Sequence, residues 1–112
     1  MRAATSIFLY DGDKRFFGEG PCRLLNGIEK TGSLRAAAMD MNMSYSKALH
    51  IIANAEKVLG FSLTEKSIGG KNGGGSVLTP KAKEFLEKFE AYREACYEAN
   101  SRLYNEFFSD KR

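Results

Sequence analysis

The most constraining feature of this sequence is a pair of helix signals separated by a very short turn, within residues 33–60. Ser33 is suited to cap a first helix, and Asn42 tolerates the left-handed conformation that closes one. Ser44 is suited to cap a second helix, which Gly60 ends. The first helix has apolar residues at helical spacing, namely Leu34, Ala37, Ala38 and Met41. This arrangement predicts a helix-turn-helix, although a generic antiparallel helix pair fits the spacing equally well.

The next segment favours the helix-turn-helix. FSLTEKSI and SVLT are strand candidates, and GGKNGGG forms a flexible connection between them. A helix-turn-helix followed by a β-hairpin is a winged helix, with a wing over residues 61–79 and its loop over 68–76. We expect residues 69–75 of this loop to be disordered in the free protein. The glycines allow backbone amides to approach a phosphate closely.

A nucleotide-binding loop is the enzymatic alternative for the same glycines. It would need GxxxxGK[ST] between a strand and a helix, with the lysine after the last glycine. Here Lys71 precedes the glycine run, and a strand candidate stands on each side. The chain also has one histidine and two widely separated cysteines, without metal-ligand spacing. We therefore expect no catalysis, no metal and no cofactor.

Two further segments flank this unit. At the N-terminus, residues 5–17 predict a β-hairpin turning at Asp11-Gly12, and residues 18–32 predict a helix with Pro21 in its first turn.

From Pro80 the chain lacks glycine and proline, which predicts a helix of nearly thirty residues with Thr79 as its cap. Part of this helix must cover the domain's own core, and we expect the rest to pair with a second subunit; the alternative is that it folds back on its own hairpin. The residues expected at the dimer contact form a near-heptad stripe: Phe85, Phe89, Tyr92, Cys96, Leu103 and Phe107.

Charge is unevenly distributed along the chain. Residues 1–83 carry 12 Lys and Arg against 7 Asp and Glu, whereas residues 84–112 carry 5 against 7. The first part is therefore the expected partner of a polyanion.

No apolar run approaches the roughly 20 residues that a membrane helix needs, so we expect no membrane association. Cys22 and Cys96 are expected to be reduced thiols in a cytoplasmic protein.

Helical periodicity divides the predicted recognition helix, residues 44–59, into two faces. Its apolar residues share the core face: Ala48, Ile51, Ile52, Ala55, Val58 and Leu59. The N-terminal part of such a helix enters the major groove of DNA. The candidate DNA-binding residues are Ser44, Tyr45, Ser46, Lys47 and His50 in this helix and Lys66, Lys71 and Asn72 in the wing. His50 also fits a plain exposed histidine, and Tyr45 fits a half-buried core residue.

GSLRAAAMDMNMSYSKA and LTEKSIGGKNGGGSVLTPKAKEFL together resemble the N-terminal winged-helix domain of ModE-type molybdate-dependent transcriptional regulators. The resemblance covers about residues 18–92, and its wing is the most specific part. The helix-turn-helix half is also similar to LysR-type regulators. The resemblance implies a dimeric bacterial DNA-binding domain whose wing lies against the DNA backbone.

Some family features differ here. Members commonly have arginines and a tryptophan early in the recognition helix, where this chain has SYSKALH, and Asn42 replaces the usual turn glycine. Full-length members continue into a molybdate-binding domain of small β-barrels. Nothing in these 112 residues can form such barrels, so we do not expect direct molybdate binding. Binding of an oxyanion at a dimer interface is a weaker alternative.

The sequence thus predicts an α+β, mostly α fold: a winged helix-turn-helix with an N-terminal β-hairpin and a long C-terminal dimerisation helix. Residues 1–79 form the DNA-binding part and residues 80–112 the long helix of the same domain. The predicted function is sequence-specific binding of double-stranded DNA by a homodimeric transcriptional regulator. The alternative is a protein-interaction module that keeps the winged-helix fold but has lost DNA reading.

Overall fold

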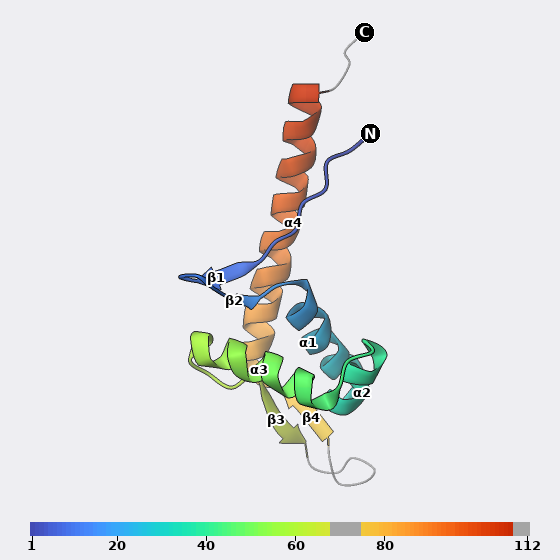
Figure 1. Ribbon diagram of the computed structural model, residues 1–112, viewed down its shortest axis with the longest axis vertical. Coiled ribbons are helices and arrows are strands. Elements are labelled where there is room, and N and C mark those ends of the chain that lie inside the picture. Colours follow the sequence, from blue (N-terminus) through green and yellow to red (C-terminus); the bar gives the residue numbers. More distant parts are fainter. Residues whose placement is uncertain (68–74, 109–112) are drawn as a thin grey trace.

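The computed structural model describes residues 1–67 and 75–108. In this part of the chain, three short helices and two β-hairpins form a body from which the second half of a long helix projects (Figure 1). The long axis measures 63 Å, against 29 and 24 Å for the other two. The elements are β1 (Leu9–Asp11), β2 (Lys14–Phe17), α1 (Glu19–Thr31), α2 (Leu34–Asp40), α3 (Tyr45–Leu59), β3 (Thr64–Ser67), β4 (Gly75–Leu78) and α4 (Pro80–Phe108).

Local side-chain caps produce the predicted helix-turn-helix. The Ser33 hydroxyl accepts a hydrogen bond from the Ala36 amide at 3.0 Å and starts α2. The Ser44 hydroxyl accepts one from the Lys47 amide at 3.1 Å and starts α3. Between them Asn42 has a φ of 54°, the left-handed conformation that asparagine tolerates. The predicted caps and turn are confirmed.

The packing of α2 on α1 depends on small side chains. Ala37 is only 1% exposed and faces Gly27 of α1. A β-carbon placed on Gly27 would lie 2.9 Å from the Ala37 β-carbon, closer than real β-carbons approach other atoms. The two helices therefore meet almost backbone to backbone.

The base of the wing is tied to both ends of the helix-turn-helix. β3 and β4 pair as an antiparallel hairpin. The Ser76 amide donates to the Gly32 carbonyl at 2.8 Å, which joins β4 to the corner between α1 and α2. The Leu63 amide donates to the Glu56 carboxylate at 2.7 Å, which joins the approach to β3 to α3. These two contacts fix the direction in which the wing leaves the body.

The first half of α4 closes the hydrophobic core. Phe17 of β2 meets Phe85 and Phe89 edge to face, with ring centroids 4.8 Å apart in both pairs. Phe89 is 3% exposed. These two phenylalanines, which the sequence assigned to dimerisation, therefore pack within their own chain. The fully buried side chains of the same core include Cys22, Leu24, Leu25, Ile28 and Leu63.

The N-terminal hairpin is shorter than predicted. We expected its first strand to begin at Thr5, but β1 begins at Leu9. Because β2 ends at Phe17 and α1 follows almost at once, no strand remains to pair with residues 5–8. The first residues instead run beside α4, where the Asn100 side-chain amide donates to the Ala3 carbonyl at 3.0 Å (Figure 1). In the described part of the chain, α4 included, no helix combines the length and hydropathy of a membrane span.

The contact between α1 and α2 gives a first prediction. Replacing Gly27 by alanine should lower the free energy of unfolding by about 1–3 kcal/mol, because the added methyl group overlaps Ala37. Adding Ala37→Gly in the same chain should recover part of this loss. Urea denaturation of the two single variants and the double variant measures the coupling.

Gly20→Ala is the matched control, since a β-carbon there has no atom within 4 Å. It lies in α1 as well and should be neutral or stabilising by up to about 1 kcal/mol. If both alanine variants have the same stability, the close contact between α1 and α2 is not what positions these helices.

Candidate nucleic-acid interface

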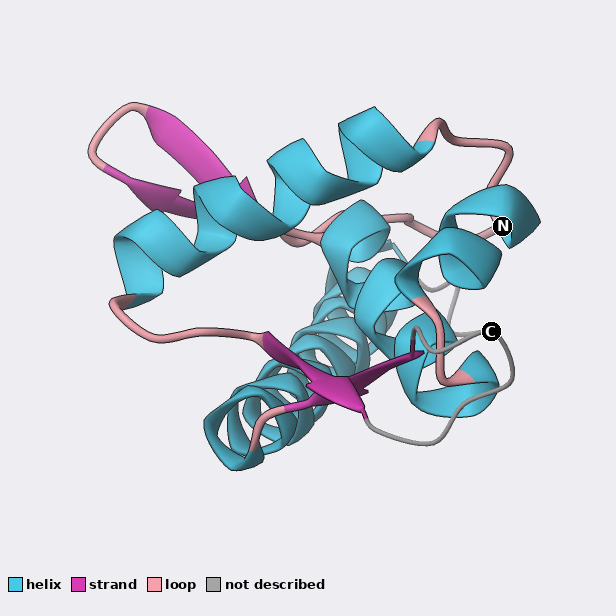
Figure 2. Cartoon of the chain, turned by 90° about the horizontal axis from the view of Figure 1, so that it is seen from below, coloured by secondary structure: helices cyan, strands magenta, loops and turns pink. Residues whose placement is uncertain are grey.

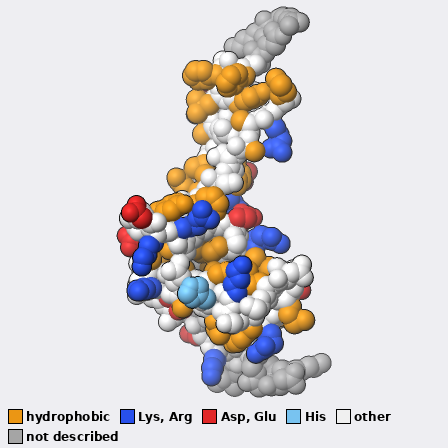
Figure 3. All heavy atoms as spheres, in the orientation of Figure 1, with side chains coloured by type: hydrophobic (Ala, Val, Ile, Leu, Met, Phe, Trp, Pro, Cys, Tyr) orange, Lys and Arg blue, Asp and Glu red, His pale blue; other side chains and the backbone are white. Residues whose placement is uncertain are grey.

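The outer face of α3 is the most prominent candidate surface. Ala48, Ile52 and Ala55 are buried on its inner face. The opposite face exposes Ser46, Lys47, His50, Ala53, Asn54 and Lys57 to solvent. On the side of the molecule in Figure 3, Lys and Arg side chains lie around the single histidine. The predicted division of this helix into a core face and an outer face is confirmed.

The N-terminal end of α3 favours an anion. Ser44 caps it, and its first turn contains no acidic residue. The free amides and the helix dipole therefore give this end a positive potential, to which Lys47 adds a full charge. Ser44, Tyr45, Ser46, Lys47 and His50 are all exposed, and the structure brings them together on the first two turns of one helix.

Arg35 of α2 belongs to the same surface, and the sequence reasoning missed it. Its guanidinium carbon lies 4.1 Å from the centre of the Tyr45 ring, so the cation is stacked beside the start of α3. Arg35 is exposed, whereas its neighbours on the alanine face are buried. Its place in SLRAAAM could have identified Arg35 as a surface residue. It is the one charged residue in the first turn of a helix whose opposite face consists of alanines.

The wing is described only at its base. Lys66 is exposed on β3, paired with Ser76 of β4. Its neighbour Glu65 points to the other face of the hairpin because side chains alternate along a strand. Lys71 and Asn72 lie outside the described residues, as does the expected disorder over residues 69–74. The last residue of that predicted segment, Gly75, begins β4.

A polar cluster holds α4 where it leaves the body. The Arg93 guanidinium contacts the Glu19 carboxylate at 2.7 Å, and the Asn26 side-chain amide donates to the Glu90 carboxylate at 2.9 Å. Cys22 lies between these pairs, with its sulfur 3.6 Å from an Arg93 nitrogen. Burial raises the pKa of the Cys22 thiol, and the positive charge of Arg93 opposes this only in part. This thiol is therefore a weak nucleophile and a structural part of the joint between α1 and α4.

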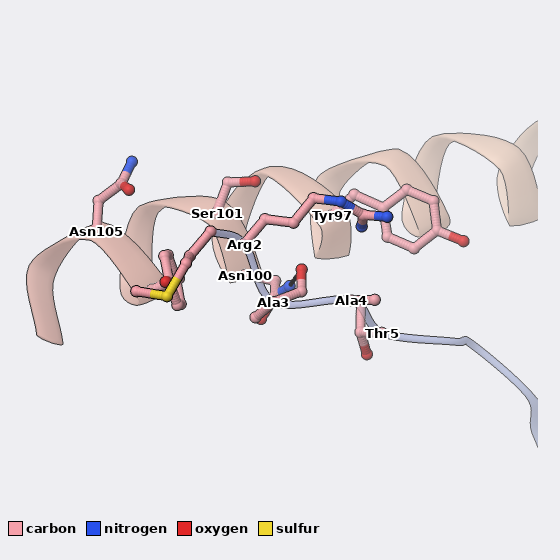
Figure 4. A pocket seen from close by; sticks show the side chains of 10 residues that line it. Arg2, Ala3, Ala4, Thr5, Tyr97, Asn100, Ser101 and Asn105 are labelled. Carbon is pink, nitrogen blue, oxygen red and sulfur yellow. Dashed lines mark hydrogen bonds between the residues drawn. The ribbon is translucent and has the colours of Figure 1, made fainter. Parts of the chain in front are cut away.

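At this joint and along its projecting half, α4 exposes apolar side chains. Tyr92, Leu103 and Phe107 are 53%, 47% and 76% exposed, and the next residue, Phe108, is 68% exposed. Cys96 is half-buried. A neighbouring face of the helix carries the N-terminal segment, with an open groove of about 320 Å³ between Met1–Thr5 and the polar side chains of α4 (Figure 4).

The family model for bacterial regulatory helix-turn-helix proteins of the lysR family matches residues 22–83. This span begins in α1, contains α2, α3 and the wing, and ends in the first turn of α4. It therefore covers Arg35, the outer face of α3 and Lys66 of the wing, but neither the N-terminal hairpin nor the projecting half of α4.

Similar proteins include several named ModE, in agreement with the predicted resemblance. The chain is 40% identical over 74 residues to the molybdenum transport protein ModE of Herbaspirillum seropedicae and 37% identical over 68 residues to the transcriptional regulator ModE of Haemophilus influenzae. It is 30% identical over 90 residues to the DNA-binding transcriptional dual regulator ModE of Escherichia coli K12. The matched segments cover 66%, 61% and 80% of this chain but only 26%, 27% and 34% of those relatives.

Solved structures with the same fold include two of CbnR. The crystal structure of the CbnR DNA-binding domain in complex with DNA has a TM-score of 0.59 at 23% identity, covering 74% of this chain and 90% of that one. Full-length CbnR complexed with its target DNA has a TM-score of 0.60 at 22% identity, covering 77% of this chain and 28% of that one. At this identity the likeness concerns the fold, and the predicted winged helix-turn-helix is confirmed.

Proposed function

Because this chain belongs to the lysR family of bacterial regulatory helix-turn-helix proteins, we propose that it is a DNA-binding transcriptional regulator that acts as a homodimer. The observation that carries this proposal is the outer face of α3, where Lys47 and His50 are exposed beside the stacked Arg35. An α-helix with its side chains is about 10–12 Å across, and the major groove is about 12 Å wide, so this face fits the groove. The matched ModE relatives that are named as transcriptional regulators support the same function.

The residues of the surface divide into two roles. Tyr45, Ser46, Lys47 and His50 lie on the first two turns of α3 and would meet base edges. The capped helix end at Ser44, together with Arg35, would bind phosphates and set the depth of the helix. In the wing, Lys66 would meet the backbone, and Lys71 and Asn72 are proposed to do the same.

The homodimer would form through the projecting half of α4. A helix of 29 residues is roughly 43 Å long, and only its first part is needed to cover the core. Since Phe85 and Phe89 belong to that core, the contact is left to the stripe of Tyr92, Cys96, Leu103 and Phe107. Residues 1–79 would then form the reading part, and residues 80–112 the connection between two such parts. Two copies of α3 would meet successive major grooves, about one helical turn apart.

Reversal of one charge tests the role of α3. Lys47→Glu should weaken binding to the protein's preferred genomic DNA fragments by about tenfold or more, because a carboxylate then faces the phosphate-lined groove. Fluorescence anisotropy at two salt concentrations measures the affinity and its salt dependence. Lys57→Glu is the matched control, with the same charge change on the exposed distal end of the same helix, and its effect should be smaller.

The alternative function predicts a different pattern. A winged helix used only as a protein-interaction module would show no salt-sensitive DNA binding even before substitution. That result for the unsubstituted protein would refute the proposed function.

Introduction of a charge into the α4 stripe tests the dimer. Leu103→Glu should raise the dimer dissociation constant at least about tenfold, because two carboxylates would be buried against apolar side chains. Ala91→Glu is the control; it adds the same charge at an exposed position roughly a third of a turn from the stripe. Sedimentation equilibrium measures the dimer dissociation constant of both variants. A protein concentration of about 100 μM is on the order of ten times a dimer dissociation constant of 10 μM. An unsubstituted protein that stays monomeric at this concentration would contradict the proposed interface.

A further inference from the structure

A second hairpin lies beside the candidate recognition helix. In both orientations α3 lies between the β3–β4 wing on one side and the β1–β2 hairpin on the other (Figures 1 and 2). The Asn54 side-chain amide of α3 donates to the Arg15 carbonyl of β2 at 3.2 Å, so the two elements are in direct contact. Between them is an open groove of about 290 Å³ whose lining includes Phe8, Arg15, Pro21, His50, Ile51 and Asn54.

Arg15 is held in position at the edge of this groove. Its guanidinium carbon lies 4.0 Å from the centre of the Phe8 ring and 5.8 Å from that of the Tyr10 ring. Two of its nitrogens are 3.4 Å from the Tyr10 hydroxyl. Stacking on the rings restricts the side chain but leaves its charge intact, and Arg15 is exposed. Within residues 1–67 and 75–108, the ion pair with a nitrogen–oxygen distance of 4 Å or less is that of Arg93 with Glu19. No carboxylate in this part of the chain therefore forms an ion pair with Arg15.

The charges of the hairpin are arranged so that Arg15 differs from its neighbour Lys14. In the strand register Lys14 stands opposite Asp11, whereas Arg15 stands opposite Tyr10. Successive side chains of a strand point to opposite faces, so these two cations do not share a face. Asp11 and Asp13 are exposed at the turn and would repel phosphates from the tip. Arg15 is therefore the cation of this hairpin that both lines the groove and has no carboxylate opposite it.

We propose that the β1–β2 hairpin is a second contact to the DNA backbone, in which Arg15 binds a phosphate along the major groove that α3 enters. This inference rests on the proposed function. A helix of about 10–12 Å nearly fills a groove about 12 Å wide, so an element packed against its side meets the sugar–phosphate wall. The wing is on one side of α3, and the hairpin reaches the wall on the other. Such a contact fixes the depth and register of α3 without reading sequence.

The salt dependence of DNA binding tests this proposal. Each phosphate contact contributes about 0.9 to the slope of log affinity against log salt concentration. Because each of the two copies in the proposed homodimer loses one phosphate contact, Arg15→Ala should reduce the magnitude of this slope by about 1.8 and weaken binding about fivefold or more at 0.1 M salt. Lys14→Ala removes one positive charge from the adjacent residue and should change the slope by less than half as much.

A conservative variant separates the phosphate contact from a loss of hairpin structure. Arg15→Lys keeps the charge but loses the planar group that stacks on Phe8, so it should retain most of the slope even where its melting temperature falls. If Arg15→Lys loses as much slope as Arg15→Ala, or if Arg15→Ala and Lys14→Ala are alike, the proposal is overturned.

The proposed function and this inference fail in different ways. Absence of salt-sensitive DNA binding by the unsubstituted protein removes both. Salt-sensitive binding that Lys47→Glu weakens and Arg15→Ala leaves unchanged would retain α3 as the reading helix and overturn the hairpin contact alone.

Discussion

The close packing of α2 on α1 is the constraint on which the rest of the structure depends. Gly27 and Ala37 bring the two helices almost into backbone contact, and the corner between them carries the Gly32 carbonyl that accepts the Ser76 amide of the wing. With α2 fixed, the short turn at Asn42, which has a φ of 54°, sets the direction of α3. The outer face of α3, the wing and the N-terminal hairpin therefore keep their relative positions because the helices beneath them have no room to shift.

The sequence predicted the features that depend on local chemistry. Ser33, Asn42 and Ser44 act through their own backbone neighbourhood, so their residue types and spacing were enough to locate the helices and the turn. The two faces of α3 followed from helical periodicity for the same reason. The caps and the faces are the parts of the candidate site that can be predicted without a structure.

Features that depend on distant contacts were missed or incompletely predicted. A heptad stripe cannot tell which of its members face the chain's own core, so Phe85 and Phe89 were assigned to dimerisation although Phe17 covers them. Residues 5–8 contain the β-branched and aromatic side chains typical of a strand, but the path of the chain leaves them no partner. The stacks of Arg35 on Tyr45 and of Arg15 on Phe8 likewise join separate elements, which no local pattern reveals.

In the proposed complex, two copies of α3 enter successive major grooves of one DNA site. Dimethyl sulfate footprinting tests it directly, because the reagent methylates guanine N7 in the major groove and adenine N3 in the minor groove. We predict two patches of protected guanine N7, with centres roughly 10 base pairs apart, on a DNA fragment that the protein binds. Protection confined to adenine N3, or a single guanine patch at saturating protein, would contradict it.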